Sequence, residues 1–175
     1  MCRLIKVICL VVMILSIGLS AQETDSAGTR ASYDMGPTTL SGPRIGVTLV
    51  TGESAETLQE KFDADPVVTQ FGWHFEKRFF SVKNGLCGVT EVITLIGGVE
   101  QGLFLPSLNW LAGLRWPNGF ELGFGPNISL TGFAYVFGLG VTIRQGRLNI
   151  PINMSVVMSK KGPRFSLLVG FNAAG

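Results

Sequence analysis

His74 is the only histidine of the chain and the first residue to examine for chemistry. It stands two positions before Glu76, so on a β-strand both side chains would point to one face, where the carboxylate could orient the imidazole as a general base. A general base needs a nucleophile to activate, and no serine or cysteine stands in a recognisable nucleophile motif. We therefore predict that the protein is not an enzyme and that His74 is a hydrogen-bonded structural residue. A lipid-modifying activity that uses His74 is the alternative.

A second set of chemically informative residues consists of arginines and glutamates at alternating positions of apolar segments. Charges enclosed together must pair, because an unpaired buried charge costs several kcal/mol. Three arginines balance three glutamates in this pattern, which indicates a structural ion-pair network rather than a catalytic site. The predicted network comprises Arg44, His74, Glu76, Glu91, Asn109, Arg115, Glu121, Arg144 and Asn153.

An acidic segment follows the first apolar segment and contains Glu53, Glu56, Glu60, Asp63 and Asp65. It could bind a cation or a basic partner, but we favour a solvated loop. Neither this segment nor the rest of the chain shows the spacing of a metal site. We predict no metal and no cofactor.

Eight short segments of alternating hydrophobicity must position these residues. They span about 44–51, 69–79, 87–96, 103–116, 119–128, 133–144, 147–158 and 164–172, and the breaks carry turn residues such as Asn84-Gly85 and Asn118-Gly119. Short connections imply antiparallel neighbours. The predicted fold is all-β: an eight-stranded antiparallel up-and-down (meander) β-barrel. Good helix formers from Ser54 to Phe62 predict one short helix in the loop after the first strand.

The alternation separates an apolar face from a polar one in nearly every segment. In the sixth, Tyr135, Phe137 and Leu139 fall opposite Gly138 and Gly140. The third segment is ambiguous, because Val92 and Ile93 fall on opposite faces. Parity alone does not say which face points inward, since a soluble lipid-binding barrel encloses its apolar face and a membrane barrel exposes it.

The glycines favour one orientation. They weaken strands without benefit on a solvated face, but a narrow eight-stranded interior has room for only a few large side chains. The glycines on the polar face are Gly46, Gly72, Gly113, Gly123, Gly125, Gly138, Gly140 and Gly170. We therefore predict a closed polar lumen and an apolar exterior that faces lipid.

The amino terminus predicts export. Arg3 and Lys6 precede an uncharged apolar run, Val7 to Leu19, and small residues follow at Ser20 and Ala21; this order is typical of a cleaved signal peptide. The predicted organisation is a signal peptide over 1–21, a flexible leader over 22–43 and a transmembrane barrel domain over 44–175. Removing the signal peptide reduces the 14 basic residues to 12, equal to the 12 acidic ones. A neutral chain gives no support for nucleic-acid binding.

The signal peptide, strand count, alternation and interior arginine and glutamate residues resemble the small eight-stranded outer-membrane barrels of Gram-negative bacteria, the outer membrane protein A and X type. The resemblance covers about Arg44 to Asn172. It implies delivery by the barrel-assembly machinery and outer-membrane lipids as partners. Members often end on an aromatic strand residue, whereas Phe171 here is followed by four more residues. Lipid A deacylase barrels carry a His-x-Ser element, but Glu76 stands two positions after His74.

We expect a monomer in the outer membrane with a structural or loop-mediated role and without catalysis. The alternative is a periplasmic or secreted lipocalin-like barrel that binds an apolar ligand. It predicts that Trp110, Phe137 and Leu139 point into the barrel. A third interpretation takes the uncharged stretch from Leu122 to Ile143 as a membrane helix.

Overall fold

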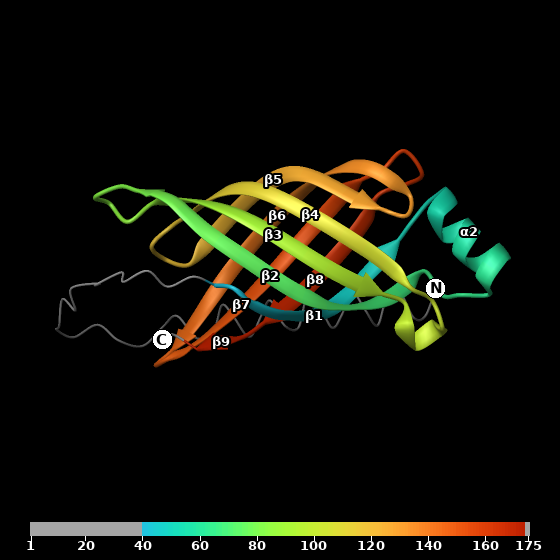
Figure 1. Ribbon diagram of the computed structural model, residues 1–175, viewed down its shortest axis with the longest axis horizontal. Helices are drawn as coiled ribbons and strands as arrows, with labels where there is room; N and C mark the ends of the chain where they lie inside the picture. Colours follow the sequence, from blue (N-terminus) through green and yellow to red (C-terminus); the bar gives the residue numbers. More distant parts are fainter. Residues whose placement is uncertain (1–39, 174–175) are drawn as a thin grey trace. The chain divides into compact units, whose positions relative to one another are not determined.

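The computed structural model describes residues 40–173, so the predicted signal peptide and most of the predicted leader lie outside the described residues. Eight antiparallel strands follow one another around a closed barrel, and β1 completes it by pairing with both β2 and β8 (Figure 1). The eight strands are β1 (Gly42–Val50), β2 (Val67–Ser81), β3 (Cys87–Gly97), β4 (Leu105–Arg115), β5 (Phe120–Ser129), β6 (Gly132–Gln145), β7 (Leu148–Met158) and β8 (Arg164–Gly170). The predicted meander barrel is confirmed.

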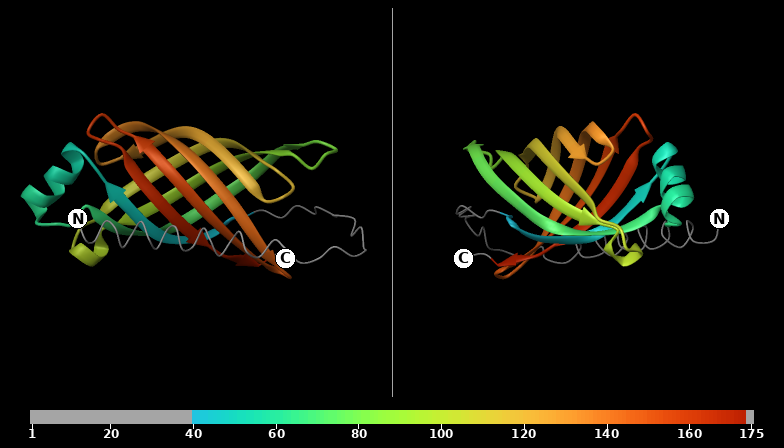
Figure 2. Two further views of the ribbon diagram at one scale, coloured as in Figure 1. Left: turned by 180° about the vertical axis from the view of Figure 1, so that it is seen from behind. Right: turned by 45° about the vertical axis from the view of Figure 1, so that its right-hand side comes forward.

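The barrel has two ends of different construction. The connections β2–β3, β4–β5 and β6–β7 are short turns, and the end of the barrel that they form is called the turn end. The opposite end, the helix end, carries helix α2 (Glu53–Phe62) between β1 and β2 and the 3-10 helix η1 (Val99–Gln101) between β3 and β4. Figure 2 shows α2 beside the barrel mouth, and the β2–β3 hairpin extends in the opposite direction.

Helix α2 begins one residue before the predicted Ser54 and ends at the predicted Phe62. Leu58 is its buried apolar anchor and packs against Val50, Ala64 and Val68. Glu53 and Glu56 lie in the first turn, where the helix dipole favours negative charge. The backbone N–H of Ser54 donates to the carbonyl of Lys161 over 3.0 Å, which ties the helix to the β7–β8 connection.

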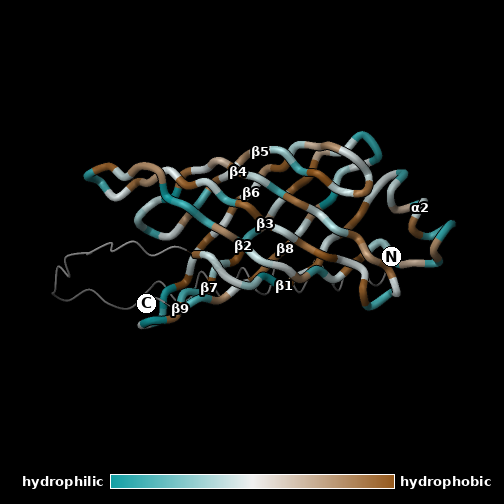
Figure 3. The backbone as a smooth tube through the Cα atoms, in the orientation of Figure 1, coloured by the Kyte–Doolittle hydropathy of each residue, from teal (hydrophilic) through white to brown (hydrophobic). Residues whose placement is uncertain are grey.

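The apolar face of the alternating strands points outward. Trp110, Phe137 and Leu139 are 59%, 48% and 49% exposed, whereas Arg115 and Glu121 are 2% and 4% exposed. Figure 3 shows the resulting mixture of apolar and polar residues along each strand. Side chains enclosed by the barrel wall are therefore mainly polar or small, and the large apolar side chains cover the outside.

Several details differ from the sequence-based expectations. The segment from Leu122 to Ile143 forms parts of β5 and β6 rather than a helix, and no helix among the described residues is long and apolar enough to cross a membrane. In β3 the ambiguity is resolved because Val89, Glu91 and Leu95 are buried and Thr94 is exposed. An additional two-residue strand, β9 (Asn172–Ala173), pairs with the first residues of β7.

The interior is also less uniformly polar than predicted. Leu111, Ala134, Val136 and Val157 form a buried apolar cluster inside the barrel, with Ile93 packed against it. These residues fall on the inward side of the alternation in their strands. They are too few and too scattered in the sequence for the alternation to predict a cluster. The polar groups of the lumen are consequently divided into two regions, one at each end.

Candidate functional site

Six ionisable side chains from five neighbouring strands meet inside the turn end of the barrel. β1 supplies an arginine, β2 a histidine and a glutamate, β3 a glutamate, β4 an arginine and β5 a glutamate. All six are at most 8% exposed. This buried charge network consists of Arg44, His74, Glu76, Glu91, Arg115 and Glu121.

Arg115 is the hub of the buried charge network. Its Nη1 and Nη2 donate to the two carboxylate oxygens of Glu76 over 2.6 and 2.5 Å, a bidentate pairing. Its Nε and Nη2 also donate to Oε2 of Glu121 over 2.9 and 2.6 Å. The remaining oxygen of Glu121 accepts from Nδ2 of Asn153 over 2.6 Å. Both carboxylates thus recover, inside the barrel, the hydrogen bonds that they would make with water.

His74 links a cation to an anion in the same network. Nη2 of Arg44 lies 2.5 Å from Nδ1 of His74, and because arginine can only donate, Nδ1 is the acceptor. The imidazole is therefore neutral and carries its proton on Nε2, which lies 3.3 Å from Oε2 of Glu91. That Nε2–H group makes no well-directed hydrogen bond, and its contact with the Glu91 carboxylate is electrostatic. Arg44 is further held by the carbonyls of Leu40 and Pro43.

The spacing of His74, Glu76 and Glu91 would suit a divalent cation, since their ligand atoms lie within 4.8 Å of one another. Their hydrogen bonds argue against this use. Nδ1 of His74 accepts from Arg44, which places the proton on the nitrogen that would have to bind the metal. Both oxygens of Glu76 accept from Arg115. Two guanidinium groups therefore already supply the positive charge that the carboxylates require.

The same contacts bear on the general-base interpretation of His74. Within residues 40–173 its polar side-chain contacts are with Arg44 and Glu91, and neither is a nucleophile. The imidazole is also only 1% exposed. The geometry is that of a structural bridge inside the barrel wall.

A second polar cluster occupies the interior toward the helix end. Asn127 is fully buried and donates through Nδ2 to Oδ1 of Asn109 over 2.8 Å and to Oγ of Ser107 over 2.9 Å. Arg164 donates to Oδ1 of Asn127 over 2.7 Å and to Oγ of Ser129 over 3.0 Å. Asn109 was predicted as a lumen residue, but Asn127 and Arg164 were missed. The inward parity of Glu121, Gly123 and Gly125 extends to Asn127 and could have identified it.

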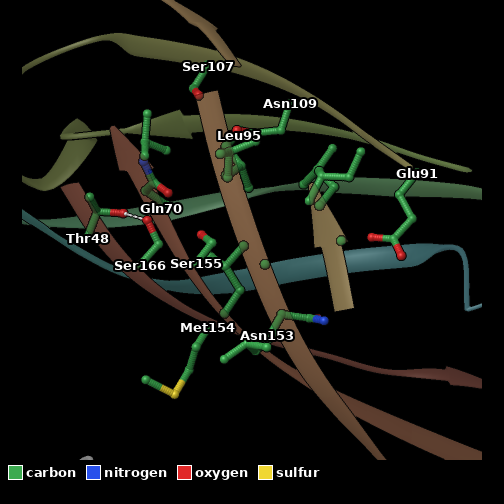
Figure 4. Close-up of a pocket in the computed structure, with 18 of the residues that line it drawn as sticks. Thr48, Gln70, Glu91, Leu95, Ser107, Asn109, Asn153, Met154, Ser155 and Ser166 are labelled. Carbon is green, nitrogen blue, oxygen red and sulfur yellow. Dashed lines mark hydrogen bonds between the residues drawn. The ribbon is translucent and has the colours of Figure 1, made fainter. Parts of the chain in front are cut away.

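A small cavity lies between the two polar regions, with a volume of about 60 Å³. Figure 4 shows Thr48 and Gln70 from β1 and β2, and Glu91 from β3, among its lining side chains. The buried Oε1 of Gln70 has no hydrogen-bond partner. Because one enclosed water needs about 10–15 Å³, the cavity has room for about four to six waters. Drug-sized ligands occupy pockets of about 300–1,000 Å³.

Arg144 does not join the buried charge network, contrary to the prediction. Its side chain is exposed, because the pairing of β6 with β5 ends at Val141 and Arg144 pairs with β7 alone, opposite Asn149. Parity directs a side chain toward one face, but cover also depends on the neighbouring strands: Arg115 is the last residue of β4, yet it is buried because it pairs with both β3 and β5. Of the other predicted network residues, Asn153 is half-buried beside Glu121 and Asn109 lies in the second polar cluster.

The eight predicted lumen glycines lie on the inward face, and their surroundings fall into three groups. A Cβ would overlap a neighbouring strand's carbonyl oxygen at Gly46, Gly72, Gly113 and Gly125. It would overlap side chains of the buried charge network or of Asn153 at Gly140 and Gly170, and it would contact the Leu111 side chain at Gly123 and Gly138.

The outer surface is the remaining candidate site. Large apolar side chains cover it on successive strands and pack against one another, as in the ring contacts of Phe124 with Tyr135 and Phe137 at centroid distances of 5.6 and 4.6 Å. This apolar belt includes Ile45, Phe71, Trp73, Phe75, Leu108, Trp110, Leu122, Phe124, Tyr135, Phe137, Leu139, Val141, Met154 and Phe165, which are 41–66% exposed.

Comparison of the chain with protein-family models, curated proteins and solved structures finds no match.

Proposed function

We propose that this protein is an integral outer-membrane β-barrel with a structural or loop-mediated role and no catalytic activity. The observation that carries the proposal is the inverted distribution of polarity. Arg115 and Glu76 are buried inside the barrel, while Trp110 and Phe137 lie on the outside. A soluble domain rarely exposes a contiguous apolar patch of more than a few hundred Å². Acyl chains of lipids cover such a surface without cost.

The geometry supports the alternative, a barrel that carries an apolar ligand, less well. That function needs an apolar interior with space for the ligand. Here the interior contains paired charges and a cavity of about 60 Å³. The filled interior equally favours a closed barrel over an open pore, as expected for eight strands.

Membrane fractionation tests the proposal directly. Cells that express the full chain are lysed, and their membranes are washed with alkaline carbonate or with urea. We expect the protein to stay in the membrane pellet and to migrate differently on gels before and after boiling, because a folded barrel resists detergent. The boiled sample is the control that separates a folded barrel from aggregated chain. Release into the wash would overturn the proposal.

A charge on the apolar belt provides a second prediction. Leu139 lies in the middle of β6 and is 49% exposed. In a bilayer, Leu139→Arg should lower the free energy of unfolding by about 2 kcal/mol, because arginine near the midplane loses its hydration. On a water-exposed surface the same change would stay within about 0.5 kcal/mol. Urea titrations of the barrel in lipid vesicles measure the difference.

The matched control for Leu139→Arg is Leu130→Arg. Leu130 lies in the β5–β6 connection at the rim of the barrel and is 69% exposed. Near a membrane interface the cost of arginine falls to about 0–1 kcal/mol. Equal small effects of the two substitutions would contradict a lipid-facing belt.

A further inference from the structure

The two ends of the barrel carry opposite charge on their outer surfaces. At the helix end, acidic side chains outnumber basic ones: Glu53, Glu56, Glu60, Asp63, Asp65 and Glu100 against Lys61, Lys160 and Lys161. Near the turn end, the exposed charged side chains of the described residues are Lys77, Lys83, Arg144 and Arg147, while Arg78 is half-buried. Among the described residues, the acidic groups of that half are the interior Glu76, Glu91 and Glu121. The turn end therefore presents a basic exterior.

The β2–β3 hairpin adds aromatic groups to this basic end. β2 is 15 residues long, longer than the other strands, and the hairpin extends past the neighbouring turns (Figure 1). The pairing register with β3 shifts between Arg78 and Phe80, which marks a β-bulge. A bulge directs consecutive side chains toward one face. Phe79 and Phe80 are accordingly both exposed, at 59% and 42%, and their ring centroids lie 5.1 Å apart.

Gly88 on β3 leaves the space that these two rings occupy. A Cβ at this position would overlap the ring of Phe80 and come within 2.8 Å of the ring of Phe79. The glycine thus allows both rings to lie along the outer surface of the hairpin. Exposed Lys77 and Lys83 stand on either side of the aromatic pair in the sequence. The hairpin tip, residues 77–88, combines apolar rings with flanking ammonium groups.

That combination matches the chemistry of a bilayer interface. Aromatic rings favour the boundary between acyl chains and headgroups, and lysine side chains extend from apolar surroundings toward anionic phosphate groups. We propose that the hairpin tip binds the headgroups of anionic phospholipids at the surface of the membrane that holds the barrel. This inference rests on the proposed function. Each basic residue near an anionic surface contributes about 1 kcal/mol, equivalent to about a fivefold preference.

Lipid-specific quenching of tryptophan fluorescence tests the proposal. Trp116 lies at the β4–β5 turn, at the same end as the hairpin tip, and contacts Phe120. In the full chain with Trp73→Phe and Trp110→Phe, it is the only tryptophan left to report on the lipids of that end. The barrel is refolded into phosphatidylcholine vesicles that contain either brominated phosphatidylglycerol or brominated phosphatidylcholine of the same chain length. We expect quenching to show about a fivefold or greater preference for phosphatidylglycerol.

Charge variants assign the preference to the hairpin tip. Lys77→Gln with Lys83→Gln should reduce the preference by about fivefold or more, because both ammonium groups are removed from the tip. The matched control, Lys160→Gln with Lys161→Gln, removes the same charge from the helix end and should leave the preference unchanged. High salt should weaken it through screening.

The outcomes separate this inference from the function on which it rests. Strong quenching by both lipids without preference would overturn headgroup binding and leave the membrane barrel intact. A preference that survives Lys77→Gln with Lys83→Gln would also overturn the assignment to the tip. Absence of quenching by either brominated lipid would contradict the membrane function itself. If the phosphatidylglycerol preference is absent and the protein sediments as a dimer, the hairpin tip would instead contact a second copy of the chain.

Discussion

Replacement of Arg115 by alanine should lower the free energy of unfolding by about 3–5 kcal/mol, the cost of removing one partner from a buried ion pair. The Arg115 side chain is 3% exposed, and those of Glu76 and Glu121 are 0% and 5% exposed. Without the guanidinium, both carboxylates would remain inside the barrel facing each other and Glu91. Within the buried charge network, Arg44 would then be the one arginine left opposite three glutamates.

The size of this effect depends on the fork geometry of arginine as well as on its charge. Arg115 uses three nitrogens to reach both oxygens of Glu76 and one of Glu121. A lysine ammonium is a single point donor and cannot reproduce the bidentate pairing. Arg115→Lys should therefore restore part of the stability that Arg115→Ala loses. An intermediate value would separate the contribution of charge from that of geometry.

Urea titration of the refolded barrel, followed by tryptophan emission, measures these changes. Arg144→Ala is the matched control. Like Arg115, Arg144 falls on the inward-facing side of the alternation in its strand, but its side chain is exposed at the barrel rim. Its removal should change the free energy of unfolding by less than about 0.5 kcal/mol. A loss below about 1 kcal/mol for Arg115→Ala would contradict the buried pairing.

The comparison of Arg115 with Arg144 also shows what the sequence could and could not predict. Alternation in β6, with Phe137 and Leu139 opposite Gly138 and Gly140, was enough to identify the strand and its two faces. Burial depends in addition on the position along the barrel axis, which is set by pairing with the neighbouring strands. Arg115 is the last residue of β4 but pairs with both Cys87 and Glu121, whereas Arg144 pairs with Asn149 of β7 and lies beyond the pairing of β6 with β5.

Features that depend on contacts between distant strands were the ones that the sequence did not reveal. The apolar cluster around Leu111 requires that β4, β6 and β7 bring Val136 and Val157 to the same level inside the barrel. The bulge after Arg78 leaves no local composition signal, because Phe79 and Phe80 alone fit a regular strand equally well. Hydrophobic periodicity identifies faces, and register decides which residues on a face meet.

Gly72→Ala is expected to destabilise the barrel by about 3 kcal/mol or more, although it adds a single methyl group. A Cβ at Gly72 would overlap the carbonyl oxygen of Thr94 on the paired strand β3. Overpacked sites usually relax by rotating a side chain, at a cost of about 1–3 kcal/mol. Here the obstacle is backbone, so relief requires separating β2 from β3 and weakening the pairing that holds Gly72 opposite Leu95.

Gly138→Ala is the matched control, because Gly138 is also a half-buried, inward-facing strand glycine. The nearest atom to its added Cβ would be Cδ2 of Leu111 at 3.2 Å, the end of a flexible side chain that can move aside. Its stability should change by less than about 0.5 kcal/mol, since alanine also loses less backbone entropy than glycine on folding. The folded fraction on unboiled gels and the urea midpoint report both variants. If Gly72→Ala were as stable as Gly138→Ala, the glycines would serve to make room in the lumen, and the close approach of neighbouring strands would not explain Gly72.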